Sequence, residues 1–140
     1  MKGMANPLND YLKPDLNAEL NGISTQGLAH VGDAVFELMV RTWLCMEGAS
    51  TAKNLHGGSV ALVSAKAQAA AAERILPLLN EEERAVFMRG RNAHLSSAPR
   101  ASTFGEYHAA TAIEALFGHL YLSGETKRLN ELFEVIVYAS

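Results

Sequence analysis

Two acidic residues lie in segments that are otherwise small and apolar, and they are the strongest candidates for chemistry in this sequence. Asp33 lies between Gly32 and Ala34, and Glu114 is followed by Ala115. Asp is disfavoured inside helices, and a carboxylate without a partner is costly to remove from water. Two carboxylates from two packed helices are the smallest oxygen-ligand set for Mg²⁺. The same pattern also fits two acids that cap helices or pair with arginine, and the residue types alone leave both interpretations open.

A second candidate feature is a basic segment. Residues 84–105 contain four arginines and no acidic residue, and two of the arginines stand close together in the run Arg89-Gly90-Arg91-Asn92. Guanidinium groups suit phosphate because they form paired hydrogen bonds with its oxygens. Cations at the end of a helix also stabilise the helix dipole, and Asn92 is also a plausible cap. Phosphate binding and helix termination are therefore both compatible with this run.

Other motifs that carry chemistry are missing from the sequence. Gly57-Gly58 is not followed by the Lys-Ser/Thr of a phosphate-binding loop, and no Gly-x-Ser-x-Gly run is present. The single cysteine, Cys45, excludes a disulfide scaffold and a cysteine-rich zinc site, and its apolar surroundings predict a buried thiol. His30 lies three residues before Asp33, but this spacing is common by chance.

Length and composition indicate one globular domain. The chain has 140 residues, of which 49% are hydrophobic and 19% charged, so it can bury a core and is too apolar to be disordered. The formal net charge of −3 argues against a binder of nucleic acid that is basic overall, although the charges are segregated along the chain. No apolar run approaches the ~20 residues of a membrane span, and the N-terminus lacks a secretory signal. We therefore expect a cytoplasmic protein that does not enter a membrane.

Helix signals dominate the sequence, and strand signals are almost absent. We predict an all-α fold with an irregular lead-in over residues 1–23 and one helical domain over residues 24–140. The first helix is apolar on nearly all sides, which predicts that it is central and covered by the others. The second predicted stretch is interrupted at Gly57-Gly58. The helices are expected over residues 24–46, 51–76, 80–91, 103–123 and 125–138.

Five sequence blocks, taken in order, resemble one family. Residues 28–37 (LAHVGDAVFE) resemble the first acidic helix of the ribonuclease III family, and residues 114–118 (EALFG) resemble its second. Three further blocks, at residues 63–69, 89–93 and 107–111, are similar to the Mini-ribonuclease III branch, which has no separate double-stranded-RNA-binding domain. The resemblance covers residues 28–122, which is most of the chain.

The resemblance implies a specific enzyme. Members of this branch adopt the all-helical ribonuclease III endonuclease fold, act as homodimers and use Mg²⁺ to hydrolyse double-stranded RNA, leaving 5′-phosphate and 3′-hydroxyl ends. They mature the ends of 23S ribosomal RNA precursor, and a ribosomal protein is a possible helper. The match implies that Asp33 and Glu114 bind the metal and are catalytic. Expected RNA contacts are Arg89, Arg91, Asn92, Lys66 and Arg100, although Lys66 could equally be a solvated helix residue.

This sequence also departs from full-length ribonuclease III. Ala29 stands where the longer enzymes have a glutamate, and Thr111 stands where they have an aspartate. Both differences are typical of the Mini branch. The carboxylate shell is therefore thinner, so water, Thr111 or backbone carbonyls must complete the coordination of a metal. His30 replaces an aromatic residue that reaches the dimer partner in the parent family.

Two other classes of function remain as alternatives. The first is a non-catalytic RNA-binding or ribosome-associated module on the same fold, which the retention of Asp33 and Glu114 disfavours. The second is a helical dimerisation domain that binds no nucleic acid, which the basic segment disfavours. RNA binding that is independent of Mg²⁺ and yields no product would support the first. RNA titrations that do not depend on salt would support the second, because phosphate contacts weaken steeply with salt.

Overall fold

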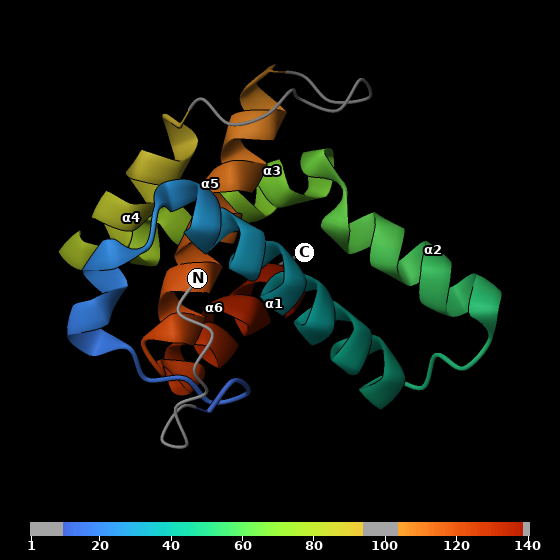
Figure 1. Cartoon of the computed structure of the whole chain (residues 1–140). Coiled ribbons are helices and arrows are strands. Elements are labelled where there is room, and N and C mark those ends of the chain that lie inside the picture. The colour runs from blue at the N-terminus through green and yellow to red at the C-terminus, as the bar shows by residue number, and fades with distance from the viewer. Residues whose placement is uncertain (1–9, 94–103, 139–140) are drawn as a thin grey trace.

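The computed structural model describes residues 10–93 and 104–138, and these residues form helices connected by short turns (Figure 1). No residue in these two ranges belongs to a β-strand, so the predicted all-α fold is confirmed. No described helix is long and apolar enough to cross a membrane. The elements are η1 (Asn17–Gly22), α1 (Thr25–Met46), α2 (Ala52–Val63), α3 (Ala65–Ile75), η2 (Leu76–Leu78), α4 (Glu81–Arg91), α5 (Phe104–Leu122) and α6 (Thr126–Tyr138).

Helix α5 is the centre of the fold. Helices α1, α3 and α4 all pack against it, and α6 packs against α3 and α5 (Figure 1). The prediction that the first helix is the central one is wrong, because Leu38 and Met46 of α1 are 62% and 78% exposed. Apolar residues around a helix show that it can be covered, but they do not show which of its faces has a partner.

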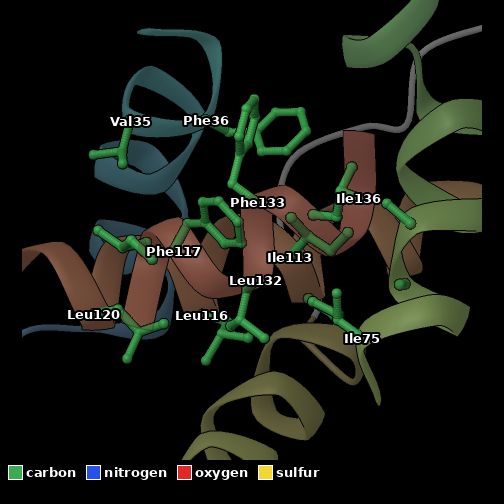
Figure 2. Packing of buried hydrophobic residues seen from close by; sticks show 14 of the residues in the cluster. Val35, Phe36, Ile75, Ile113, Leu116, Phe117, Leu120, Leu132, Phe133 and Ile136 are labelled. Atoms are coloured by element: carbon green, nitrogen blue, oxygen red, sulfur yellow. The ribbon is translucent and has the colours of Figure 1, made fainter. Parts of the chain in front are cut away.

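Three aromatic rings join α1, α5 and α6 at the centre of the main hydrophobic cluster (Figure 2). Phe36 meets Phe117 and Phe133 edge-on, with ring centroids 5.4 and 6.1 Å apart, which is a favourable geometry for aromatic pairs. A smaller cluster around Leu28, Val86 and Ala115 joins α1, α4 and α5 on another side. These two clusters hold α1 and α5 in a fixed relation to each other.

Local sequence determines where most helices begin. The Ser24 Oγ accepts a hydrogen bond from the Gly27 N–H at 3.0 Å and caps α1 as expected. Asn80 and Glu83 form a reciprocal capping box at the start of α4. Gly124, just after α5, has a φ of 76°, a backbone conformation that glycine adopts without strain. The predicted ranges of α1, α4 and α6 are therefore confirmed to within a residue or two.

The predicted interruption at Gly57-Gly58 is wrong. Helix α2 runs through both glycines, and the chain breaks at Ser64, whose Oγ caps α3 by accepting from the Ala67 N–H. A Cβ at Gly58 would lie 2.7 Å from Leu44 Cδ2, so this glycine lets α2 pack closely on α1. Cys45 is also a correction, because it is exposed in the open cleft between α1 and α2 and is not buried.

The described part of the lead-in is more regular than expected. Residues 17–22 form the 3₁₀ helix η1, and Leu20 is buried in the smaller cluster. The Leu16 N–H donates a hydrogen bond to the Leu122 carbonyl oxygen at 2.8 Å. The segment therefore packs on the end of α5, while a domain boundary at residues 23/24 stays a prediction.

An ion pair joins the start of α4 to α6. The Arg128 guanidinium donates to both carboxylate oxygens of Glu83, at 2.8 and 2.9 Å, and to the Leu78 carbonyl oxygen at 2.8 Å. Burial by itself would raise the pKa of Glu83, which is only 4% exposed. The hydrogen bonds from Arg128 and from the Asn80 backbone outweigh burial and hold this pKa below its ordinary value. Glu83 is therefore ionised at neutral pH.

We expect Glu83→Gln to lower the free energy of unfolding at pH 7 by about 2 kcal/mol, because it leaves the partly buried Arg128 without its counter-charge. The depressed pKa means that the contribution is complete above about pH 4.5 and is lost as pH falls through the native pKa. Urea unfolding at pH 7 and pH 3 checks both statements. The matched control is Glu37→Gln, which removes an exposed pair with Arg41 and should cost less than about 0.5 kcal/mol. Equal losses for the two variants would contradict this prediction.

Candidate functional site

The crossing of α1 and α5 brings Asp33 and Glu114 together. Gly32 of α1 lies directly against the backbone carbonyl of Glu114, where an added Cβ would be 1.6 Å from the carbonyl oxygen. The two carboxyl groups lie close enough to repel each other when both are charged and to share a hydrogen bond when one of them is protonated. The two residues that the sequence singled out are thus direct neighbours, although they are far apart along the chain.

The environments of the two carboxyl groups differ. Asp33 is exposed, whereas Glu114 is half-buried between α1 and α5. Burial, repulsion by the Asp33 carboxylate and the hydrogen bond to Asp33 together raise the pKa of Glu114 to about 8. At neutral pH, without a cation, Glu114 therefore retains its proton and donates it to Asp33 in the hydrogen bond. A cation bound between the two carboxylates in place of this proton would relieve the repulsion between them.

An open cavity of about 500 Å³ adjoins the carboxyl pair. Thr111 lies one turn before Glu114 on α5 and is 2% exposed, and its hydroxyl donates to the Tyr107 carbonyl oxygen at 3.0 Å. The Thr111 oxygen keeps lone pairs that can accept a hydrogen bond from water. The lining consists of Ser24, Gln26, Gly27, Ala29, His30, Asp33, Tyr107, Thr111 and Glu114.

The pair fits a hydrated divalent cation better than a fully enclosed one. Across the described ranges, no cluster of three or more His, Cys, Asp or Glu side chains could hold a metal ion by itself. Mg²⁺ commonly binds through one or two carboxylates and keeps several waters. Two adjacent carboxyl groups, one of them protonated because burial and the neighbouring carboxylate disfavour its charge, supply this kind of site together with the open cavity beside them.

The end of α4, which carries predicted phosphate contacts, packs on the part of α5 that lines this cavity. Arg89 and Arg91 are exposed in the last turn of α4. Gly90, between them, packs so tightly on α5 that an added Cβ would lie 3.0 Å from the Thr111 carbonyl oxygen. Asn92 is the C-cap residue of α4 and is exposed. The two arginines therefore flank a residue in contact with the turn of α5 that lines the cavity.

The remaining predicted contacts are less informative. Lys66 is exposed in the first turn of α3 and does not line the cavity beside the carboxyl pair. Arg100 lies outside the described residues. The structure therefore places Asp33 and Glu114 together, whereas Lys66 and the two arginines of α4 do not line the cavity beside them.

Gln26 and Tyr107 line the cavity but were not candidates from the sequence. Each lies seven residues before one of the two acids, Gln26 before Asp33 and Tyr107 before Glu114. Residues two helical turns apart lie on the same face of a helix. This spacing is the signal in the sequence that could have identified both residues once the acids were chosen.

The chain is similar to known proteins over most of its length. The family model for the ribonuclease III domain matches residues 26–125, a range that includes both acids and the end of α4. The chain is 42% identical to the Mini-ribonuclease 3 of Symbiobacterium thermophilum over 107 residues, which are 76% of this chain and 82% of the relative. It is 37% identical to the Mini-ribonuclease 3 of Clostridium tetani, over 91% of this chain and 83% of the relative.

A solved structure has the same fold. A crystal structure of a protein from Fusobacterium nucleatum superposes on this chain with a TM-score of 0.76 at 32% sequence identity. The superposition covers 84% of this chain and 94% of the other. The arrangement of helices around α5 is therefore shared across nearly the whole length of that relative.

Proposed function

Because the chain belongs to the ribonuclease III family, in its Mini-ribonuclease 3 branch, and is an endoribonuclease, we propose that it cleaves double-stranded RNA in a Mg²⁺-dependent reaction. The products are RNA ends with a 5′-phosphate and a 3′-hydroxyl. The observation that carries the proposal is the Asp33–Glu114 pair beside an open cavity.

In this proposal Asp33 and Glu114 hold Mg²⁺, and water and the polar groups around Thr111 complete its surroundings. Bound Mg²⁺ would supply Lewis acidity, activating water as the nucleophile and stabilising the leaving oxygen. Glu114 must lose its proton for this role, and its raised pKa makes that loss dependent on a positive charge nearby. Asp33, which is exposed and lines the open cavity, would hold the cation from the solvent side.

The proposed RNA contacts come from Arg89, Arg91 and Asn92 at the end of α4, with Lys66 and Arg100 as outer contacts. Double-stranded RNA is recognised mainly through its shape, its phosphates and its 2′-hydroxyls. Two exposed arginines on α4, a helix that packs against α5, can supply such contacts even in a chain whose formal net charge is −3. Affinity then depends on these contacts more than on the charge of the whole protein.

We further propose that the enzyme acts as a homodimer on the ends of 23S ribosomal RNA precursor in the cytoplasm, with a ribosomal protein as a possible helper. Cutting both strands of a duplex requires two sites in opposite orientations. A two-fold symmetric dimer provides such sites, because the twofold axis relates antiparallel strands. Family membership and this symmetry argument support the proposal.

A cleavage assay tests the function directly. The protein is incubated with long duplex RNA, with ribosomal precursor RNA and with a single strand of the same sequence, each in Mg²⁺ or in EDTA. We expect cutting of the duplex and the precursor only with Mg²⁺, and ends that a ligase requiring 5′-phosphate accepts. RNA binding without any product would favour the non-catalytic RNA-binding module instead.

The two arginines at the end of α4 give a separate prediction. Replacing both Arg89 and Arg91 by Ala should weaken RNA binding and reduce the slope of log affinity against log salt by about one unit per arginine. Fluorescence anisotropy with labelled duplex RNA between about 50 and 200 mM salt measures the slope. Arg41→Ala is the matched control, because Arg41 is an exposed arginine bonded to Glu37 on a different element. An unchanged slope in the double variant would remove these residues from the RNA interface.

A further inference from the structure

Two glycines form the point of closest approach between α1 and α5. An added Cβ on Gly32 would lie 1.6 Å from the Glu114 carbonyl oxygen and 2.7 Å from the Gly118 nitrogen. An added Cβ on Gly118 would lie 1.9 Å from the Leu28 carbonyl oxygen and 3.1 Å from the Gly32 nitrogen. Real Cβ atoms do not approach backbone atoms this closely, so any other residue would require the two helices to move apart.

The contact is reciprocal. Gly32 faces the carbonyl of Glu114, which is four residues before Gly118, and Gly118 faces the carbonyl of Leu28, which is four residues before Gly32. Each helix therefore presents a backbone carbonyl and, one turn later, a glycine to the other helix. Contacts between Cα–H groups and carbonyl oxygens of this kind recur where helices cross closely.

The carboxyl pair lies at this same point. Gly32 is the residue before Asp33, and the carbonyl that it faces belongs to Glu114 itself. Moving the helices apart at the glycines would separate these two residues directly. We propose that Gly32 and Gly118 are positioning residues, whose missing side chains set the separation of the Asp33 and Glu114 carboxylates that a divalent cation requires.

This inference rests on the proposed function, because it assigns the spacing to cation binding. The side chains of Asp and Glu are short. The distance between the two helix backbones therefore limits how close their carboxylate oxygens can come to one cation. Mg²⁺ and Mn²⁺ accept a narrow range of distances to oxygen ligands. A shift of the helices would therefore lower cation affinity even where the fold survives.

The test uses the full chain and Mn²⁺ as the probe, with binding measured by isothermal titration calorimetry. We expect Gly32→Ala and Gly118→Ala to lower Mn²⁺ affinity about tenfold or more, the scale found when the positioning of metal ligands is disturbed. They should also lower kcat on duplex RNA while leaving KM and metal-free RNA affinity within about twofold, because the arginines of α4 stay in place. In the Gly32→Ala chain, Asp33→Glu adds one methylene of reach and should restore part of the Mn²⁺ affinity.

Gly58→Ala is the matched control. It also places one methyl group in a tight helix crossing, 2.7 Å from Leu44 Cδ2, but it lies between α1 and α2, away from the carboxyl pair. We expect it to reduce stability and to leave Mn²⁺ affinity within about twofold. Loss of Mn²⁺ binding in Gly58→Ala equal to that in Gly118→Ala would show general destabilisation and overturn the proposal.

Two measurements keep the proposal testable if the alanine variants do not fold. In the wild-type chain, nuclear Overhauser effects must connect the Gly32 and Gly118 Hα protons to the backbone of the opposite helix. Asp33→Glu alone, at an exposed position, must lower Mn²⁺ affinity without loss of stability. Absence of either effect overturns the inference. If the wild-type protein binds Mn²⁺ and cleaves RNA and the glycine variants retain both properties, the inference alone is overturned. If the wild-type protein neither binds Mn²⁺ nor cleaves RNA, the proposed function is overturned as well.

Discussion

Replacing Asp33 by Asn or Glu114 by Gln is expected to abolish RNA cleavage, with a loss of at least about 10³-fold in kcat. Each change keeps the size of the side chain and removes one of the two negative charges that hold Mg²⁺ in the proposed site. Metal-ion catalysis contributes several kcal/mol to the stabilisation of a transition state, and this energy corresponds to a loss of that order. Single-turnover cleavage of duplex RNA at saturating Mg²⁺ measures the effect.

The control for these variants is Glu37→Gln. Glu37 lies on the same helix as Asp33, one turn later, and its partner is the exposed Arg41 at 2.7 Å. Its replacement should leave kcat within about twofold. Circular dichroism and unfolding curves establish that the Asp33 and Glu114 variants are folded. Cleavage at the wild-type rate in either variant would remove that carboxylate from the catalytic site.

The raised pKa of Glu114 predicts an unusual dependence of stability on pH. The native protein holds a proton on Glu114 up to about pH 8, whereas the unfolded chain releases it near pH 4.5. Between these values the native state binds more protons, so the free energy of unfolding of the metal-free protein falls as pH rises. Glu114→Gln removes this penalty, and should stabilise the protein above pH 8 by up to about 5 kcal/mol and have no effect below pH 4.5.

Urea unfolding in EDTA at pH 4, 6 and 8.5 measures this difference between wild type and variant. The same proton competes with the cation, so apparent Mg²⁺ affinity should rise about tenfold per pH unit up to about pH 8. Calorimetry in buffers with different ionisation enthalpies should detect about one proton released per cation bound at pH 7. A stability difference that is constant with pH would show that Glu114 has an ordinary pKa.

Much of the fold follows from local sequence signals. Ser24 and Asn80 mark the starts of α1 and α4 because their side chains bond to the next turn of backbone, which depends only on neighbouring residues. The break in the second stretch could not be found this way, because Gly58 serves a contact with Leu44 of another helix. A glycine has the same appearance in a sequence whether it ends a helix or lets two helices approach.

The same distinction applies to the site. Asp33 and Glu114 stand out because each is the only acid in an apolar or small-residue run, and their side chains meet in the structure. Their different exposures could not be predicted from the sequence, which indicates α1 as the central helix. In the structure α5 is central, so Glu114 on α5 is half-buried and Asp33 on α1 is exposed. The close helix contact made by Gly118 could not be predicted either, because it is with the Leu28 carbonyl, in a distant part of the chain.

That distance along the chain bears on when the protein becomes active during its synthesis. The ribosome makes α1 early and α5 near the end, and a nascent chain that reaches only the end of α4 contains Asp33 but neither Glu114 nor the helix around which the fold is built. The carboxyl pair forms only when the loop between the two helices closes, a step whose entropic cost is met by packing on α5. An incomplete chain therefore carries only half of the proposed site, so we expect nuclease activity to appear when the core is complete.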